Sequence, residues 1–369
     1  QNGHHEIVKL LLNDERVDIN KATTDGWTPF HVACENGYIE IVELLLSDQR
    51  VGINKANEYG QSPFSRACEN GQFETVKLLL NDDRVDINQV EENWRTPFLI
   101  SCYQGYIEIV KLLLNDKRIV DINRTNKYGA TPFWIICCYG SIEIVKLLLN
   151  DHRIDVNITD TLERTPFWIA CEKGHFEIVK LLLNDKRVDV NKPNNNDWTP
   201  LHVTCENGYL EIVKLLLNDE RVDINKASTD DNSTPFLIAC VNGHHEIVKL
   251  LLNDQRVDIN NAQSDGATPF FFACHNGHIQ IVKLLLNDQR IDINKAWNSG
   301  ETPSMATSYK GYIEIMKLLL SDNRIDLNKR DYNEKTALDW ARENGKTKVV
   351  ELIESFLNNP NETRTKLRI

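Results

Sequence analysis

Histidine, cysteine and carboxylate side chains are the residues of this chain that could bind a metal ion or catalyse a reaction. His4-His5-Glu6 and His244-His245-Glu246 each place two imidazoles beside a carboxylate, a ligand set that suits Zn²⁺. Adjacent residues on a helix point in different directions, so neither triplet is expected to close around one ion. The remaining histidines are scattered along the chain and are not expected to share one centre. We therefore expect no metal site.

The nine cysteines follow a regular spacing. All but Cys138 lie six residues after the first residue of a Thr-Pro or Ser-Pro pair, namely Cys34, Cys68, Cys102, Cys137, Cys171, Cys205, Cys240 and Cys274. We expect reduced thiols in a core, with metal or redox chemistry as the alternative, and Cys138 at a helix surface. The sequence contains no Cys-x-x-C pair, glycine-rich phosphate loop or nucleophile elbow. No catalytic residue and no cofactor is predicted.

The Thr/Ser-Pro pairs show that the chain is built from repeats. They begin at Thr28, Ser62, Thr96, Thr131, Thr165, Thr199, Thr234, Thr268 and Thr302, spaced 34 or 35 residues apart. A period of this size is typical of solenoids, in which each unit packs mainly on its neighbours.

The repeated text resembles that of ankyrin repeats over nearly the whole chain. Thr199-Pro200-Leu201-His202 matches the core motif of that family, and Thr28-Pro29-Phe30-His31 differs from it at one residue. The resemblance implies an all-α solenoid of helix-turn-helix units with short β-hairpin-like fingers in a curved stack. One departure recurs, because the usual glycine after the second helix is replaced by an Asn/Ser-Asp-x-Arg turn. These arginines either form a solvated charged face or bond the carbonyls at the end of the second helix.

The period divides the chain as follows. A truncated repeat supplies a second helix at 1–13, nine repeats follow, a capping repeat spans 333–357, and a loose polar tail spans 358–369. The nine repeats are 25–58, 59–92, 93–127, 128–161, 162–195, 196–230, 231–264, 265–298 and 299–332.

Within a unit, threonine caps the first helix and proline occupies its first position. Small residues on the first helix allow the second helix to pack close against it. The second helix is expected to bury Ile41, Leu44 and Leu45. A glycine with positive φ forms each finger tip. This glycine is replaced at five tips, which we expect to be less regular: Trp94, Glu163, Asp197, Asn232 and Glu334. Single-residue insertions lie within 118–121 and 227–233.

Composition limits the classes of partner. The net charge of 42 − 54 = −12 argues against nucleic acid, which requires a basic surface. No stretch approaches 18 consecutive apolar residues, so no membrane span is predicted. Free thiols favour a cytoplasmic or otherwise intracellular location. The chain starts at Gln1 inside a repeat, so we expect further sequence upstream.

Aromatic residues gather at the variable positions of the middle repeats, on the surface through which ankyrin-family proteins commonly bind partners. They are Trp94, Tyr103, Tyr128, Trp134, Tyr139, Trp168 and Trp198. Acidic residues accompany them, including Glu91, Glu92, Asp160, Glu163, Glu172, Asp197 and Glu206. Two roles remain open for these aromatic residues. Trp134 and Trp168 either bind a partner or pack between repeats, and the aromatic residues at the finger tips either bind a partner or are exposed without a role. The expected partner is a protein with basic and apolar groups.

A non-catalytic protein-interaction scaffold is the function that the sequence favours. The first alternative is a targeting or regulatory arm of a larger enzyme or channel. The second is an enzyme, for which no convergent acid, base and nucleophile can be assembled.

Overall fold

The computed structural model describes residues 2–367. These residues form two compact units, and the division lies between Asp189 and Val190, inside the predicted repeat 162–195. Each unit is described separately. All regular secondary structure in the described residues is helical, as predicted.

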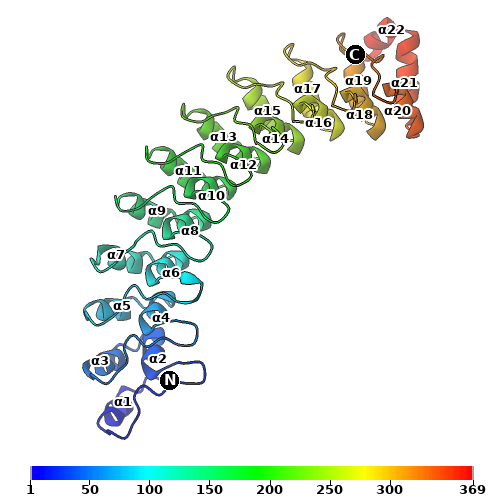
Figure 1. Cartoon of the computed structure of the whole chain (residues 1–369). Coiled ribbons are helices and arrows are strands. Elements are labelled where there is room, and N and C mark those ends of the chain that lie inside the picture. Colours follow the sequence, from blue (N-terminus) through cyan, green and yellow to red (C-terminus); the bar gives the residue numbers. More distant parts are fainter. Residues whose placement is uncertain (1, 368–369) are drawn as a thin grey trace. The chain divides into compact units, whose positions relative to one another are not determined.

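Unit 1 contains two rows of short helices (Figure 1), because each helix contacts the corresponding helices of the neighbouring repeats. The first helices are α2 (Pro29–Asn36), α4 (Pro63–Glu69), α6 (Pro97–Gln104), α8 (Pro132–Tyr139) and α10 (Pro166–Glu172). The second helices are α1 (His5–Leu12), α3 (Ile39–Ser47), α5 (Phe73–Leu80), α7 (Ile107–Asn115), α9 (Ile142–Leu149) and α11 (Phe176–Leu183). A short 3₁₀ helix, η1, spans Glu92–Trp94.

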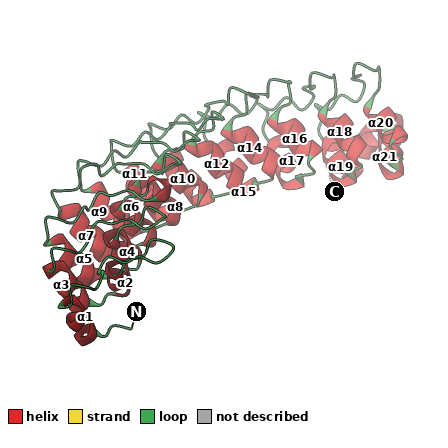
Figure 2. Cartoon of the chain, turned by 60° about the horizontal axis from the view of Figure 1, so that its bottom comes forward, coloured by secondary structure: helices red, strands yellow, loops and turns green. Residues whose placement is uncertain are grey.

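Unit 2 repeats the arrangement and adds a final helix. Its first helices are α12 (Pro200–Asn207), α14 (Pro235–Asn242), α16 (Pro269–His275), α18 (Pro303–Lys310) and α20 (Ala337–Glu343). Its second helices are α13 (Leu210–Leu217), α15 (His245–Leu252), α17 (Ile279–Leu286), α19 (Ile313–Ser321) and α21 (Thr347–Asn358), followed by α22 (Pro360–Leu367). In both units the connections between repeats lie on one side of the helices (Figure 2).

Local sequence fixes where each first helix begins. In α8 the Thr131 hydroxyl accepts the backbone N–H of Trp134, and Pro132 occupies the first helical position. Such a cap satisfies one of the backbone donors that a helix start leaves unpaired. Gly140 then ends α8 in the left-handed conformation, which glycine adopts without strain.

The core of each repeat lies between its two helices. Phe30 and Cys34 of α2 are buried against α3, where Ile41, Val42 and Leu45 are buried too. Leu44 is only half-buried, so the expectation that it belongs to the core is wrong. Val42 takes that place because the second helix packs on both its own first helix and its neighbours, which widens its buried face.

The Asp-x-Arg turn after each second helix bonds to the preceding repeat. Arg118 Nη2 donates to Asp116 Oδ2 at 2.7 Å and to the carbonyl of Leu80 at 2.7 Å. The same arginine-to-carbonyl bond recurs in both units, from Arg50 to Leu12, Arg84 to Leu46, Arg118 to Leu80, Arg153 to Leu114, Arg187 to Leu149, Arg256 to Leu217, Arg290 to Leu252 and Arg324 to Leu286. The arginines therefore cap a helix end, but that helix belongs to the repeat before.

In most repeats an asparagine four residues past this arginine makes a second link, toward the following repeat; after Arg118 it is Asn123, five residues on. Asn54 donates from Nδ2 to the Arg84 carbonyl at 2.7 Å, and its Oδ1 accepts the backbone N–H of Asp86 at 2.9 Å. One side-chain amide thus bonds a backbone N–H and a backbone carbonyl in the segment that links the next two helices. That segment forms no β-ladder that could satisfy these groups. The inserted Val120 does not break the series, because its N–H bonds to Asn88 Oδ1 at 3.2 Å.

The fingers are tight turns, and no β-strand is assigned to them anywhere in residues 2–367. One backbone hydrogen bond joins neighbouring fingers, for example from Glu92 N–H to the Tyr59 carbonyl at 3.0 Å. Within a finger, Gly60 N–H bonds to the Asn57 carbonyl at 3.0 Å. The expected fingers are therefore present, with a turn in place of a hairpin ladder.

Three of the five finger tips that lack glycine, Glu163, Asp197 and Glu334, keep this turn, so the prediction of less regular tips is wrong for them. It is confirmed at the Trp94 tip, where Asn93 also has a positive φ of 64° within the 3₁₀ helix η1. Trp94, Glu163, Asp197 and Glu334 have φ between 58° and 61°. Each donates the same turn hydrogen bond as Gly60, at 2.9 to 3.1 Å. Asn232 differs, because the extra residue in its finger moves the acceptor to Ser228.

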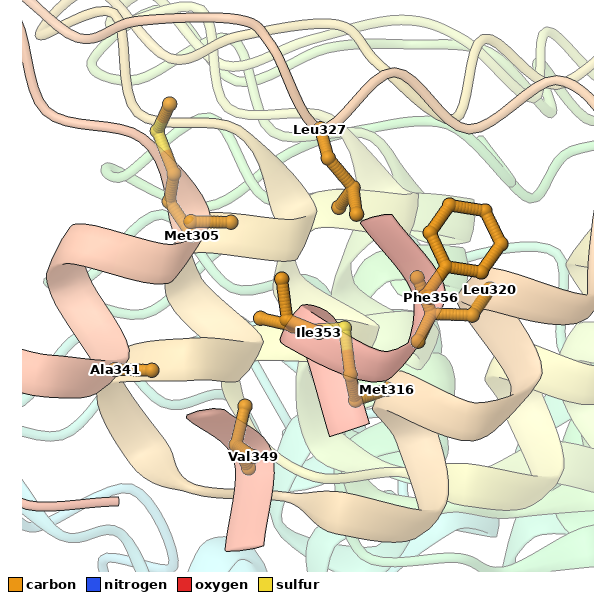
Figure 3. Close-up of a cluster of buried hydrophobic side chains, with 9 residues drawn as sticks. Met305, Met316, Leu320, Leu327, Ala341, Val349, Ile353 and Phe356 are labelled. Carbon is orange, nitrogen blue, oxygen red and sulfur yellow. The ribbon is translucent and has the colours of Figure 1, made fainter. Parts of the chain in front are cut away.

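The C-terminal end corrects a further expectation. A cluster that includes Met316, Leu320, Ile353 and Phe356 is buried between α18, α19, α20 and α21 (Figure 3). Helix α22 contacts α19 and α21, although 358–369 was predicted to be a loose tail. Pro360 starts α22, and buried Thr363 bonds the Ser355 carbonyl at 3.2 Å. Residues 368 and 369 lie outside the described range.

We expect the Arg118→Gln variant to be less stable than the wild type by about 1 kcal/mol, since it loses charge-assisted bonds to two backbone carbonyls at a partly exposed site. Lys117→Gln is the matched control, because Lys117 is the exposed neighbouring residue of the same turn. Urea unfolding followed by circular dichroism measures both. Equal midpoints for the two variants would show that the arginine link contributes nothing.

We expect a thiol reagent to label Cys138 well before the other cysteines. The eight cysteines of the repeated position are free and buried, whereas Cys138 is half-buried. Burial raises the pKa of the Cys68 thiol to about 12, so little reactive thiolate forms at neutral pH. Mass spectrometry of native protein after brief labelling gives the order. Rapid modification of several core thiols would contradict this packing.

Candidate functional site

A groove of about 530 Å³ lies in unit 1, at the corner between three fingers and the first helices α6 and α8. Finger residues supply one wall, and the helices supply the floor and the other wall. It is lined by Asn93, Arg95, Leu99, Tyr103, Asn126, Tyr128, Ala130, Trp134, Ile135, Tyr139, Asp160, Thr161, Leu162 and Arg164. Four of the seven aromatic residues predicted to bind a partner are among them, namely Tyr103, Tyr128, Trp134 and Tyr139.

Three tyrosines form the exposed part of the groove. Tyr103, Tyr128 and Tyr139 are 44%, 59% and 58% exposed. The rings of Tyr103 and Tyr139 meet edge to face, with centroids 5.1 Å apart. Burial raises the pKa of Tyr139, as does its hydrogen bond with Tyr103, so the Tyr139 hydroxyl is protonated at neutral pH. The groove therefore presents large apolar rings that end in hydroxyl groups.

The floor of the groove is buried and rigidly held. Leu99 and Ile135 are almost inaccessible, and Trp134 is 8% exposed. Trp134 Nε1 donates to the carbonyl of Arg164 at 2.9 Å. His31 and His202, at the same repeat position, make the equivalent contact with the Gln61 and Ser233 carbonyls. Trp134 is thus a packing residue that also forms the groove floor.

Arg164 lies between two tryptophans at one end of the groove. Its guanidinium carbon is 5.5 Å from the centre of Trp134 and 5.8 Å from that of Trp168. Its Nε and Nη2 donate to Asp160 Oδ2 at 2.8 and 2.6 Å. Trp168 is only 4% exposed, so its contribution is to hold this arginine rather than to meet a partner directly.

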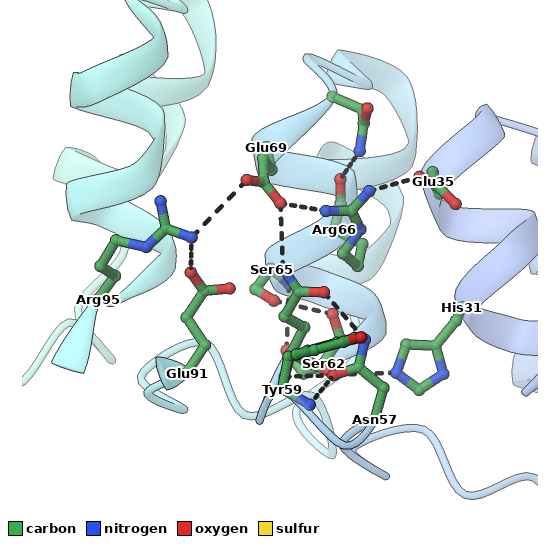
Figure 4. A network of polar contacts seen from close by, with 12 residues as sticks. His31, Glu35, Asn57, Tyr59, Ser62, Ser65, Arg66, Glu69, Glu91 and Arg95 are labelled. Carbon is green, nitrogen blue, oxygen red and sulfur yellow. Dashed lines mark hydrogen bonds and ion pairs between the residues drawn. The ribbon is translucent and has the colours of Figure 1, made fainter. Parts of the chain in front are cut away.

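A chain of ion pairs continues from Arg95 across the neighbouring repeats (Figure 4). Arg95 pairs with Glu91 and approaches Glu69 at 3.8 Å, while Arg66 pairs with both Glu69 and Glu35. Burial raises the pKa of Glu91, which is 5% exposed. Glu91 and Asp160 each open a finger, as Asn126 does, so these two acids serve the fold and are not free for a partner.

The other predicted binding residues are not part of this groove. Trp94 is 62% exposed at the tip next to Asn93 and Arg95, and Glu163 is exposed at the tip next to Arg164. Trp198 and Asp197 belong to unit 2. Trp198 is half-buried with its ring 5.9 Å from that of His202, and Asp197 accepts a hydrogen bond from Thr229.

Sequence reasoning missed Arg95, Arg164 and Leu162 as groove residues. The two arginines occupy the position just before the threonine cap, where other units have Trp27, Gln61 or Ala130. Variation at this position was visible in the repeat alignment and could have identified them. Leu162 occupies the finger position of Tyr59 and Tyr128, so variation at that position was an available signal for it as well.

Unit 1 also has a hollow beside Trp27 and Tyr38, and unit 2 has a polar one beside Arg324. Neither gathers exposed aromatic side chains. Among residues 2–367, no three histidine, cysteine, aspartate or glutamate side chains lie close enough to hold a metal ion. None of the helices in this range combines the length and apolar character needed to cross a bilayer.

We expect Glu163→Gly to raise stability, because a left-handed residue with a Cβ costs about 1–2 kcal/mol and the extra unfolded freedom of glycine offsets about 0.5–1 of that. A net gain of roughly 0.5–1 kcal/mol should appear as a higher urea midpoint. Glu58→Gly is the control, since Glu58 is exposed in another finger and has an ordinary negative φ. Destabilisation by both variants would mean that the turn at Glu163 is unstrained.

Comparison with known proteins agrees with the repeat architecture. A search of curated proteins found no match. The family model for ankyrin repeats (3 copies) matches residues 1–91, 83–160, 152–228, 220–296 and 292–363. Ankyrin repeats are generally protein–protein interaction modules, and proteins built from them are typically non-catalytic. With nearly its whole length matched, the chain belongs to the ankyrin-repeat family.

Proposed function

We propose that this protein is a non-catalytic scaffold that binds a partner protein through the groove of unit 1. The observation that carries the proposal is the convergence of Tyr103, Tyr128 and Tyr139 on one hollow with an apolar floor. Tyrosine is favoured at interfaces because it buries a large ring and keeps a polar end, and has few rotatable bonds to order.

The rigidity of the site supports the same function. The floor residues are buried, and hydrogen bonds to backbone groups fix Trp134 and the finger that begins at Asn126. A preformed surface loses little conformational entropy on docking, so more of the contact energy is kept as affinity. Trp94 extends the apolar surface beyond the groove and is proposed as an outer contact.

The tyrosine positions offer closely matched controls elsewhere on the chain. Tyr309 occupies the helix position of Tyr103 in another repeat and is 41% exposed. Tyr59 occupies the finger position of Tyr128 and is 48% exposed. Substitution of these four residues therefore removes the same side chain from equivalent backbone sites, inside and outside the groove.

We expect Tyr103→Ala and Tyr128→Ala each to weaken partner binding about thirtyfold, which corresponds to about 2 kcal/mol for a true anchor. Tyr309→Ala and Tyr59→Ala should bind as the wild type does. A pull-down with the full chain identifies the partner, and calorimetric titration measures the affinities. If the control variants lose binding while the groove variants keep it, the site lies on other repeats.

A further inference from the structure

The hydrogen-bonding groups of the groove determine which kind of partner segment it can bind. This inference rests on the proposed function. Asp160 is the one carboxylate among the groove residues, and it is already saturated. Its Oδ1 accepts the backbone N–H groups of Leu162 and Arg164 at 3.0 and 2.9 Å. Its Oδ2 accepts two N–H groups of the Arg164 side chain. A carboxylate has about four acceptor sites, so Asp160 has none left for a ligand.

The amide oxygen of Asn126, a second acceptor of the finger wall, is occupied in the same way. Asn126 Oδ1 accepts the backbone N–H groups of Tyr128 and Ala130 at 2.9 and 3.0 Å. What Asn126 still offers is its NH₂ group, a donor. The Arg164 carbonyl, which could also accept, is already bonded to Trp134.

Donors, in contrast, remain available along the groove. Both ionic contacts of Arg95 leave from Nη2, so among the described residues its Nη1 keeps donors that no other group uses, while its Nε is buried. Lys127 is exposed beside the groove, with Nζ 5.0 Å from the centre of the Tyr128 ring. The two preceding fingers carry Glu58 and Glu92 at the position of Lys127, so the sign of the charge reverses at the groove.

We propose that the groove binds an extended segment of a partner protein in which an apolar side chain is flanked by carboxylates. The apolar side chain fills the space between the tyrosines and the Leu99–Ile135 floor. The carboxylates accept from the Arg95 guanidinium and from Lys127, and such charge-assisted bonds are stronger than bonds between neutral groups. This is the opposite sign to the basic partner that the acidic residues of the sequence suggested.

The acidic residues near the groove do not outweigh these donors. Glu91 and Asp160 are buried and paired with Arg95 and Arg164. Glu92, Glu163 and Lys127 are all exposed on finger residues outside the lining, but Lys127 differs because its Nζ lies 5.0 Å from the centre of the Tyr128 ring, which lines the groove. The net charge of −12 acts over longer distances, but the Debye length is only about 8 Å at physiological salt. Contacts inside the groove therefore decide the preference.

The test uses the full chain and three fluorescent peptides with the same central Leu-Phe pair, flanked by glutamate, glutamine or lysine. Fluorescence anisotropy at physiological salt measures each affinity. We expect the glutamate peptide to bind about tenfold more tightly than the glutamine peptide, equivalent to about 1.4 kcal/mol, and the lysine peptide to bind most weakly.

A charge reversal locates the effect. Lys127→Glu should abolish the advantage of the glutamate peptide and leave the affinity for the glutamine peptide unchanged. Lys192→Glu, an exposed lysine of unit 2, is the control for net charge. Arg95 is left intact, because its removal would leave buried Glu91 without an ion-pair partner.

The outcomes separate this inference from the proposed function. Equal affinities for the three peptides, preference for lysine, or binding of none of them would overturn the carboxylate proposal. Groove binding itself is judged by the tyrosine variants against the captured partner. If Tyr103→Ala weakens that complex while the lysine peptide binds best, the scaffold function stands and the partner chemistry is basic.

Discussion

Side-chain hydrogen bonds to the backbone of a neighbouring repeat hold the long connections of this protein in place. These connections have no strand ladder, so their carbonyl and N–H groups need other partners. Arginine supplies one link and asparagine the other, as in Arg84 to Leu46 and Asn54 to Arg84. The pairing of each arginine with the aspartate two residues before it keeps the guanidinium aimed at the carbonyl. The regular spacing of fingers and helices, and therefore the groove, depends on these bonds.

The groove shows how a repeated scaffold acquires a distinct site. The residue before the threonine cap, the finger tip and the outer end of the first helix can vary without disturbing the core. At the third and fourth predicted repeats these positions hold Arg95, Tyr103, Tyr128 and Tyr139. The scaffold fixes the backbone position of each side chain, and the residue type at that position determines the chemistry of the surface.

The repeat period was sufficient to predict the fold, because Thr-Pro caps, the cysteine position and the leucine-rich second helix recur in register. It could not reveal that Arg118 bonds a helix end in the preceding repeat, since spacing alone does not say which carbonyl lies nearby. Helix α22 was missed because its sequence is polar and only Thr363 is buried. For the candidate site, the aromatic residues were identified, whereas Asp160 was misread as a surface acid because its neighbours in space were unknown.

The direction of the arginine link has a consequence for synthesis. Each arginine bonds a carbonyl about 38 residues earlier in the chain, as Arg118 does with Leu80. When each arginine emerges during synthesis, the repeat that carries its acceptor carbonyl has therefore already left the ribosome. Because repeats contact mainly their neighbours, each new one can fold on the template of the last. Assembly within each unit can then proceed from the N-terminal side without waiting for the complete chain.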